Sequence, residues 1–329
     1  MSRRERRAST MGSVTERRLR QIPGTLIARA AVLIGLGLGL ALPAVLLATP
    51  VQADLRPLTL YQRAGRSPWI VLGEIEDGDD RFARVKVIEI LKGSYDGAKL
   101  RIVFRMENFL RKAWEEKIEF AAGERAVLFL KRYETDREDG KVPEDLSAPD
   151  VFACSFGAMG KFNLPEEGAP AYLDALREFV RVTAMQDIVA QEEALLGYLT
   201  SSNPHILQAG LEQVLEGRLA GTAQVPLLLA LSDNLREAVR LNALKILVQV
   251  AEDLRAANRT LPDQPNVVNV LKGKVIGEGS DIYRAEALKG VAALAAADER
   301  AFLERISKED RAQIVRYEAS RILLSLERR

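Results

Sequence analysis

Three six-residue stretches in the C-terminal half repeat one pattern: residues 240–245 are RLNALK, residues 284–289 are RAEALK, and residues 316–321 are RYEASR. Residues 206–211, ILQAGL, form a more divergent copy. Every copy has alanine at its fourth position, and successive alanines are 34, 44 and 32 residues apart. Repeats of this length are typical of stacked helix pairs. An alanine at the same place in each pair lets neighbouring helices approach closely, while the flanking leucines and isoleucines pack between the layers.

The spacing of apolar residues after Pro165 predicts helices throughout this half of the chain. Leu173, Leu176 and Val180 share one helical face, and the residues from Leu241 to Leu254 include a long apolar stripe at helical spacing. We expect further helices over residues 186–199, 204–217, 224–231, 234–256, 265–276, 281–296, 299–306 and 310–327.

The R-x-x-A-[L/S] pattern within a helix-pair period resembles HEAT and armadillo repeats. The resemblance implies that residues 167–329 form an α-solenoid of HEAT-like repeats. It further implies an extended surface of the kind that binds a protein or a peptide.

Residues 54–166 have the pattern of a small β domain. Strands are predicted over residues 68–76, 81–91 and 100–105, the last with period-2 alternation. Helical spacing then predicts a helix over residues 107–118. Another strand is expected at residues 126–130, a long exposed loop at residues 134–150, and a final strand or strand pair at residues 151–156 and 160–164.

Three strands, a helix and one or two further strands is the order of a five-stranded Greek-key barrel of the OB type. The segments VIEILKG (87–93) and GERAVLFL (123–130) also resemble the small barrels of TIMP and netrin-like exported proteins. The paired cysteines of those families are missing here, and a different small β-sandwich is the alternative. The fold class expected for the chain is therefore a small OB-like Greek-key β-barrel followed by an α-solenoid.

Residues 1–53 predict an export signal. Eight arginines and two glutamates precede an uncharged run from Ala30 to Ala53, which ends in a small-x-small triplet, Val51-Gln52-Ala53. These are the parts of a secretory signal peptide. The predicted location is the bacterial periplasm or the extracellular space. The alternative is an uncleaved anchor, since residues 30–53 are long enough to cross a membrane.

Charge and composition exclude several classes of function. The chain has 47 basic and 46 acidic side chains, so residues 54–329 keep 39 and 44 of them and have a net charge of −5. This net negative charge argues against a nucleic-acid partner, because neutralisation of phosphates by basic side chains supplies most of the affinity of proteins for nucleic acids. A single Cys excludes an intramolecular disulfide, and a single His excludes a multi-histidine metal site. No metal, cofactor or catalytic site is predicted.

The candidate functional residues are Arg240, Arg284 and Arg316, which occupy one position of the repeat. They could form a basic strip that binds a ligand. Alternatively they could form a polar ladder between repeats, with Asp233, Asp281 or Asp310 as partners, and we favour the ladder because repeat packing itself places equivalent residues in register.

Two other side chains, His205 and Cys154, are of types that can serve in catalysis. His205 follows Asn203-Pro204 at an expected helix start, where an exposed histidine is unremarkable. Cys154 lies among aromatic residues and is expected to be a small buried apolar side chain rather than a reactive thiol.

These observations predict an exported, non-enzymatic scaffold or adaptor that binds a protein or peptide partner on its solenoid. Two hypotheses from other classes stay open. One is an envelope hydrolase with a carboxylate-based site between the two domains, and the other is a structural envelope protein tethered by residues 30–53.

Overall fold

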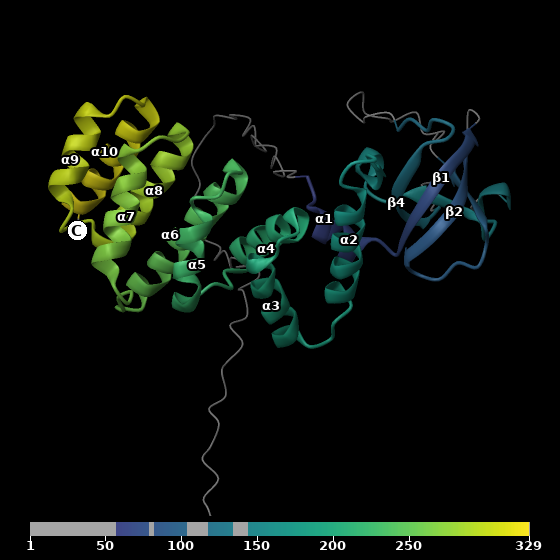
Figure 1. Cartoon of the computed structure of the whole chain (residues 1–329), viewed down its shortest axis with the longest axis horizontal. Coiled ribbons are helices and arrows are strands. Elements are labelled where there is room, and N and C mark those ends of the chain that lie inside the picture. The colour runs from purple at the N-terminus through teal and green to yellow at the C-terminus, as the bar shows by residue number, and fades with distance from the viewer. Residues whose placement is uncertain (1–56, 79–81, 104–117, 134–143, 329) are drawn as a thin grey trace, which may run out of the picture. The chain divides into compact units, whose positions relative to one another are not determined.

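A computed structural model of the chain describes residues 57–78, 82–103, 118–133 and 144–328 (Figure 1). Within these residues a small closed β-barrel is followed in sequence by a helical half. The mixed β-then-α architecture expected from the sequence is therefore confirmed. The predicted export signal and the predicted helix at residues 107–118 fall on residues 1–56 and 104–117, outside the described part of the chain.

The barrel closes through the pairing of its first and fourth strands. The strand order is β1-β2-β3-β5-β4, β1 pairs with β4, and the β3–β5 pair is parallel while the other pairs are antiparallel. The sixth strand pairs with β4 on the edge that also pairs with β5. The strands are β1 (Trp69–Gly78), β2 (Phe82–Lys92), β3 (Lys99–Val103), β4 (Arg125–Arg132), β5 (Val151–Cys154) and β6 (Lys161–Asn163).

Strands β1 and β4 are buried on both of their faces. Val71 and Leu128 point into the barrel, where they pack with Phe152 of β5. Ile70 and Phe129, one residue away on each strand, belong to a separate cluster that the helices share. Since successive side chains of a strand point to opposite faces, burial of both faces requires a continuous apolar run. The sequences IVL at 70–72 and AVLFL at 126–130 supply such runs.

Helix α1 (Leu60–Arg66) precedes the barrel in sequence but packs against α2 (Ala169–Thr183), which follows it. Thr59 and Gln62 form a capping box at its N-terminus. Lys92 of β2 closes the other end, because its Nζ donates to the carbonyl oxygens of Ala64 and Gly65 at 2.7 and 2.8 Å. A cation at a helix C-terminus satisfies carbonyl groups that have no partner within the helix.

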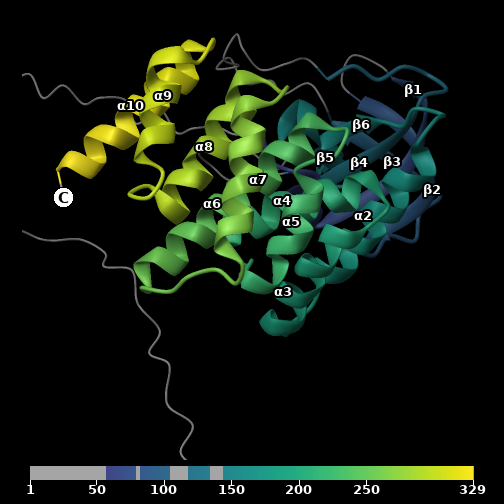
Figure 2. The ribbon, with the colours of Figure 1, turned by 60° about the vertical axis from the view of Figure 1, so that its left-hand side comes forward.

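The helical half continues with successive helix pairs (Figures 1 and 2). Its α-helices after α2 are α3 (Ile188–Gly197), α4 (Pro204–Gly217), α5 (Val225–Leu231), α6 (Glu237–Ala256), α7 (Gln264–Ile276), α8 (Asp281–Ala295), α9 (Arg300–Glu309) and α10 (Gln313–Glu327). Short 3-10 turns are Glu144–Leu146, Gly157–Gly160, Tyr198–Thr200 and Thr222–Gln224. The helices predicted between residues 186 and 327 are confirmed, with ends shifted by a few residues.

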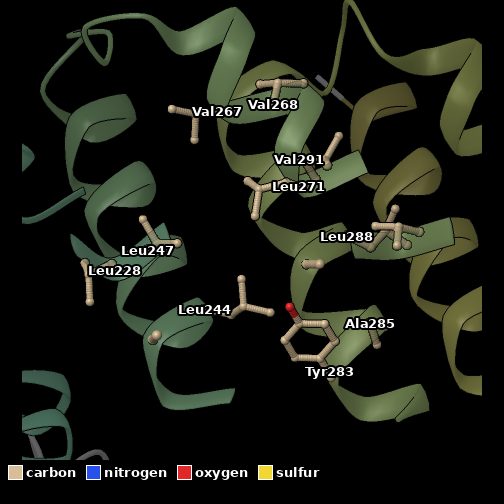
Figure 3. Close-up of a cluster of buried hydrophobic side chains, with 14 of the residues drawn as sticks. Leu228, Leu244, Leu247, Val267, Val268, Leu271, Tyr283, Ala285, Leu288 and Val291 are labelled. Carbon is tan, nitrogen blue, oxygen red and sulfur yellow. The ribbon is translucent and has the colours of Figure 1, made fainter. Parts of the chain in front are cut away.

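Helices α4, α6, α8 and α10 form one row, in which each packs against the next, and α5, α7 and α9 lie behind α6, α8 and α10. The core between the two layers is aliphatic. In Figure 3, Leu228 of α5, Leu244 of α6, Leu271 of α7 and Leu288 of α8 belong to one buried cluster.

Ala243, Ala287 and Ala319 belong to the core cluster of this row, and Ala209 of α4 belongs to the cluster shared with α2 and the barrel. Ala209, Ala243, Ala287 and Ala319 are at most 4% exposed. No helix within the described residues is both long and apolar enough to cross a membrane.

Two glycines allow a test of the barrel. Gly93, after β2, has φ +86°, and a Cβ added there would lie 2.3 Å from Cδ1 of Trp69. The indole is held, since its Nε1 donates to the Ser94 carbonyl at 3.2 Å and its ring packs edge-on against Phe152. Gly123 has φ +81° with nothing within 4 Å of an added Cβ.

We expect Gly93→Ala to lower the free energy of unfolding by about 2–5 kcal/mol, from the left-handed backbone and the clash together. Gly123→Ala is the matched control and should cost only the backbone part, about 1–2 kcal/mol. Urea denaturation followed by circular dichroism measures both. Equal losses would show that the Trp69 ring does not constrain this turn.

Candidate functional site

The three repeat arginines lie in the first turn of alternate helices. Arg240, Arg284 and Arg316 are the fourth residues of α6, α8 and α10. The guanidinium of Arg240 lies over the ring of Tyr283, 5.2 Å from its centroid. The Tyr283 hydroxyl donates to the carbonyl of Ser232 at 2.8 Å, which ties the start of α8 to the loop before α6. The N-terminal ends of α6, α8 and α10 therefore form one edge of the helical half.

Arg284 is buried on this edge, where its Nε and Nη2 bind protein groups and its Nη1 is buried without a hydrogen-bond partner among the described residues. Its Nε donates to the carbonyl of Val275 at 2.7 Å, and its Nη2 forms an ion pair with Asp310 in which both side chains are 4% exposed. Asp281 is a weaker neighbour, 3.6 Å from Nη1 and 56% exposed. The opposite Asp310 oxygen accepts from the backbone N–H of Ala312 at 2.9 Å, so the carboxylate is held from two sides.

Arg316 contacts the same loop from the following helix, because its Nη1 donates to the backbone carbonyl of Asp310 at 2.5 Å. Asp233, the third acid considered for a ladder, pairs with Lys274 instead, at 2.5 Å. Two of the three candidate acids thus contact Arg284.

Arg240 has different surroundings. Its Nε is buried and finds no hydrogen-bond acceptor within the described part of the chain. It lines a pocket of about 420 Å³ whose lining also includes Ser232, Asp233, Val270, Gly273, Lys274, Gly277, Glu278 and Tyr283. The Lys274 side chain is 9% exposed, so a buried ammonium and a partly buried guanidinium face the same pocket. We call this the Arg240 pocket.

Exposed apolar side chains accompany the arginines. Ile282 and Ile314 each lie two residues before a repeat arginine and are 57% and 47% exposed. Leu235 and Ile276 lie in or beside the neighbouring loops and are also exposed. We name these four residues, with Tyr317, the apolar edge.

Most residues of this site have no signal in the sequence pattern. The repeat alignment could have revealed Ile282 and Ile314, because both occupy the same register position. Lys274 comes from the end of the preceding helix, α7, and no repeat signal marks it.

A second, larger pocket of about 590 Å³ lies at the opposite, C-terminal ends of α6 and α8. Its lining is rich in alanine, from Ala292 to Ala297, and its Gln264 amide already donates to the carbonyl of Leu294 at 2.8 Å. No buried side-chain atom without a partner lines it among the described residues. It therefore offers fewer directed contacts than the Arg240 pocket.

Cys154 of β5, Asp150 directly before that strand and Glu178 of α2 do not belong to this edge. Burial raises the pKa of Cys154 to about 12, so its thiol is protonated at neutral pH. Hydrogen bonds from Arg101 and from Arg181 hold the pKa of Asp150 and of Glu178 below their ordinary values. Among the described residues no three His, Cys, Asp or Glu side chains are grouped as metal ligands.

His205 is partly buried rather than exposed. It lies in the first turn of α4, and its ring packs edge-on against Tyr172 with centroids 5.4 Å apart. Burial lowers its pKa from the ordinary 6.5, and the charge of Arg236 lowers it further.

No family model matches the chain, and no curated protein matches its sequence.

The Arg284–Asp310 pair predicts a large difference between two similar substitutions. Asp310→Asn keeps the hydrogen bond to Ala312 but leaves the guanidinium buried without its counter-charge, so we expect a loss of about 3–5 kcal/mol in unfolding free energy. Asp281→Asn removes an exposed partner of the same arginine and should cost less than about 1 kcal/mol. Urea denaturation of both variants measures the difference. Similar losses would mean that Asp310 is not the main partner.

His205 predicts a pH dependence of stability. Because its folded-state pKa is lowered, the unfolded chain takes up the proton first as the pH falls. The contribution of neutral His205 to the free energy of unfolding is fully present above pH 6.5, and it is lost as the pH falls through the pKa of the folded state. Urea denaturation between about pH 7.5 and about pH 5.5 should show this decline in the wild type and a flatter profile in His205→Gln. Parallel profiles would contradict the assignment, since His205 is the single histidine of the chain.

Proposed function

We propose that this protein is an exported, non-enzymatic adaptor whose helical half binds a protein partner along the N-terminal edge of α6, α8 and α10. The observation on which the proposal rests is the recurrence of exposed Ile282 and Ile314 in one register beside the repeat arginines. Single exposed apolar side chains are ordinary on protein surfaces. Exposed apolar side chains that repeat along one edge, beside a pocket lined by charged side chains, have the composition of a protein-binding surface.

The finer architecture belongs to the same proposal. We take the helical half to be an α-solenoid of HEAT-like repeats. Support comes from the row of α4, α6, α8 and α10 and from the buried alanine that each member contributes. A solenoid presents successive helix ends along an extended surface, which suits a partner that contacts several repeats.

We take the barrel to be an OB-like Greek-key barrel. The order β1-β2-β3-β5-β4, the β1–β4 closure and the parallel β3–β5 pair support this assignment. In the proposed arrangement the barrel packs directly against the helices. Buried side chains of α2 lie in one apolar cluster with four barrel residues, Ile70, Leu72, Val127 and Phe129.

Export is the remaining part of the proposal. It rests on the arginine-rich segment and the uncharged run of residues 1–53.

Site-specific photocrosslinking in cells tests the function. We expect a benzoylphenylalanine at Ile282 or at Tyr317 of the full-length chain to crosslink the same protein partner, identified by mass spectrometry. Position Ile188 of α3 is the matched control, because it is 69% exposed and does not belong to the apolar edge. Peptides of the captured chain also report its N-terminus, and a start at Asp54 would support a cleaved signal.

Two outcomes would contradict the adaptor proposal. One is the lack of any specific partner from both edge positions, which would favour a screen for hydrolase substrates. The other is an identical partner profile from Ile188, which would mean that the edge is not the binding surface. An intact N-terminus on the captured chain would favour the membrane-tethered alternative.

A further inference from the structure

The repeat supplies an internal comparison for the Arg240 pocket. Arg240 and Arg284 occupy the same position of the repeat, each in the first turn of its helix, and each faces the loop before the next helix of the row. Differences in their surroundings therefore show what each arginine has and lacks.

At Arg284 the chain itself provides a carboxylate. Asp310 lies in the loop before α10, and its two oxygens bind the guanidinium and the N–H of Ala312. The Nε of Arg284 is satisfied separately by the carbonyl of Val275. This cluster binds the carboxylate of Asp310 with protein groups alone, and the Nη1 of Arg284 is left without a hydrogen-bond partner among the described residues.

At Arg240 the corresponding acceptors are missing from the described part of the chain. Asp310 lies six residues before Arg316, and the residue six positions before Arg284 is Glu278. Glu278 is exposed, lines the pocket and makes no ion pair with Arg240. The Nε of Arg240 is buried without an acceptor, although the ring of Tyr283 holds the guanidinium in place.

We infer that the Arg240 pocket binds a carboxylate of a partner protein at the guanidinium of Arg240, to which the described part of the chain supplies no carboxylate of the kind that Asp310 supplies to Nη2 of Arg284. A guanidinium presents two parallel N–H groups that match the two oxygens of a carboxylate. The other donors of the pocket are already engaged, because Lys274 pairs with Asp233 and the Tyr283 hydroxyl donates to Ser232.

The charges of the pocket favour a carboxylate over a phosphate. Arg240 and Lys274 are balanced by Asp233 and Glu278, which line the same pocket. A carboxylate therefore gives the filled pocket a net charge of −1 and a dianionic phosphate gives it −2, which is the less favourable of the two.

The apolar edge argues for an acidic side chain of a protein rather than a free acid. Ile276 precedes the Gly277–Glu278 rim of the pocket, and Ile282 follows it. This surface fits an aspartate or glutamate flanked by apolar residues. That the carboxylate belongs to a partner protein rests on the proposed function. That the pocket binds a carboxylate does not depend on it.

Arginine side-chain NMR of the full chain tests the chemistry directly. The Nε–Hε signal of Arg240 is assigned by its loss in Arg240→Lys, and the signal of Arg284 is the internal reference. We expect N-acetyl-aspartate N-methylamide to shift the Arg240 signal saturably and to leave the Arg284 signal unchanged. N-acetyl-asparagine N-methylamide, of the same shape without the charge, should have no effect, and inorganic phosphate should bind at least tenfold more weakly.

Three results would overturn the inference. The first is no shift of the Arg240 signal with the aspartate probe. The second is an equal response to phosphate or to the asparagine probe. The third is a shift of the same signal in Glu278→Gln without any probe, which would mean that Glu278 already fills the site.

The crosslinking assay separates this inference from the proposed function. Capture of the partner from position Ile282 should fall at least tenfold in Arg240→Gln, and Asp281→Asn on the same edge should leave it unchanged. Undiminished capture in Arg240→Gln would refute the carboxylate contact and leave the adaptor proposal standing. A carboxylate response by NMR with no partner captured by the wild type would refute the adaptor proposal and leave the pocket chemistry standing.

Discussion

Close contact between helices at one repeated alanine determines the geometry of the helical half. Ala243, Ala287 and Ala319 are buried in the core of the row that α6, α8 and α10 form, and Ala209 of α4 is buried in the cluster shared with α2. Any larger side chain there would push the neighbouring helices apart, and a well-packed interior tolerates added volume poorly. Since the arginine of each of the last three copies lies three residues before its alanine, the alanine contact also brings the N-terminal ends of α6, α8 and α10 to one edge. The packing constraint and the candidate site are therefore consequences of the same repeat.

The barrel meets the helices through a second constraint, the burial of β1 and β4 on both faces. The outer face of these strands would be an apolar surface in an isolated barrel, and it is covered by α1 and α2 through residues such as Tyr61 and Phe179. Lys92 adds a directed contact, and its burial lowers its pKa below the ordinary value. The barrel and the first helices thus depend on one another for the burial of their apolar surfaces.

Most elements of the fold could be predicted from the sequence because their signals are local. Period-2 alternation and continuous apolar runs marked the strands, and helical stripes with Pro204 or Pro265 near their starts marked the helices. The short helix α1 was missed although Thr59 and Gln62 form a readable capping box, because its seven residues are too few for a periodic stripe. The partners of a strand or helix far along the chain, such as the packing of α1 on α2, have no local signal at all.

The site was less predictable for a related reason. A repeated arginine at one register position is expected from repeat packing, and the motif does not distinguish an arginine that holds the protein together from one that meets a ligand. The distinction depends on the acceptor in the next loop. An aspartate at 310 is short enough to bond the backbone of Ala312 and the guanidinium of Arg284 at once. At the equivalent position the chain has Glu278, whose longer side chain is exposed at the pocket rim.

Two arginines at the same position of the repeat thus have different surroundings, because the connecting loop has aspartate at 310 in one case and glutamate at 278 in the other. The unpaired Nε of Arg240 is tolerated because the ring of Tyr283 and the packed layers around it stabilise the same edge independently. A buried donor without an acceptor costs stability, and such groups are found where the surrounding structure compensates for them. The neighbouring Arg284–Asp310 ion pair is part of that surrounding structure, so the arginine that has a carboxylate partner within the chain supports the edge on which the other arginine lies.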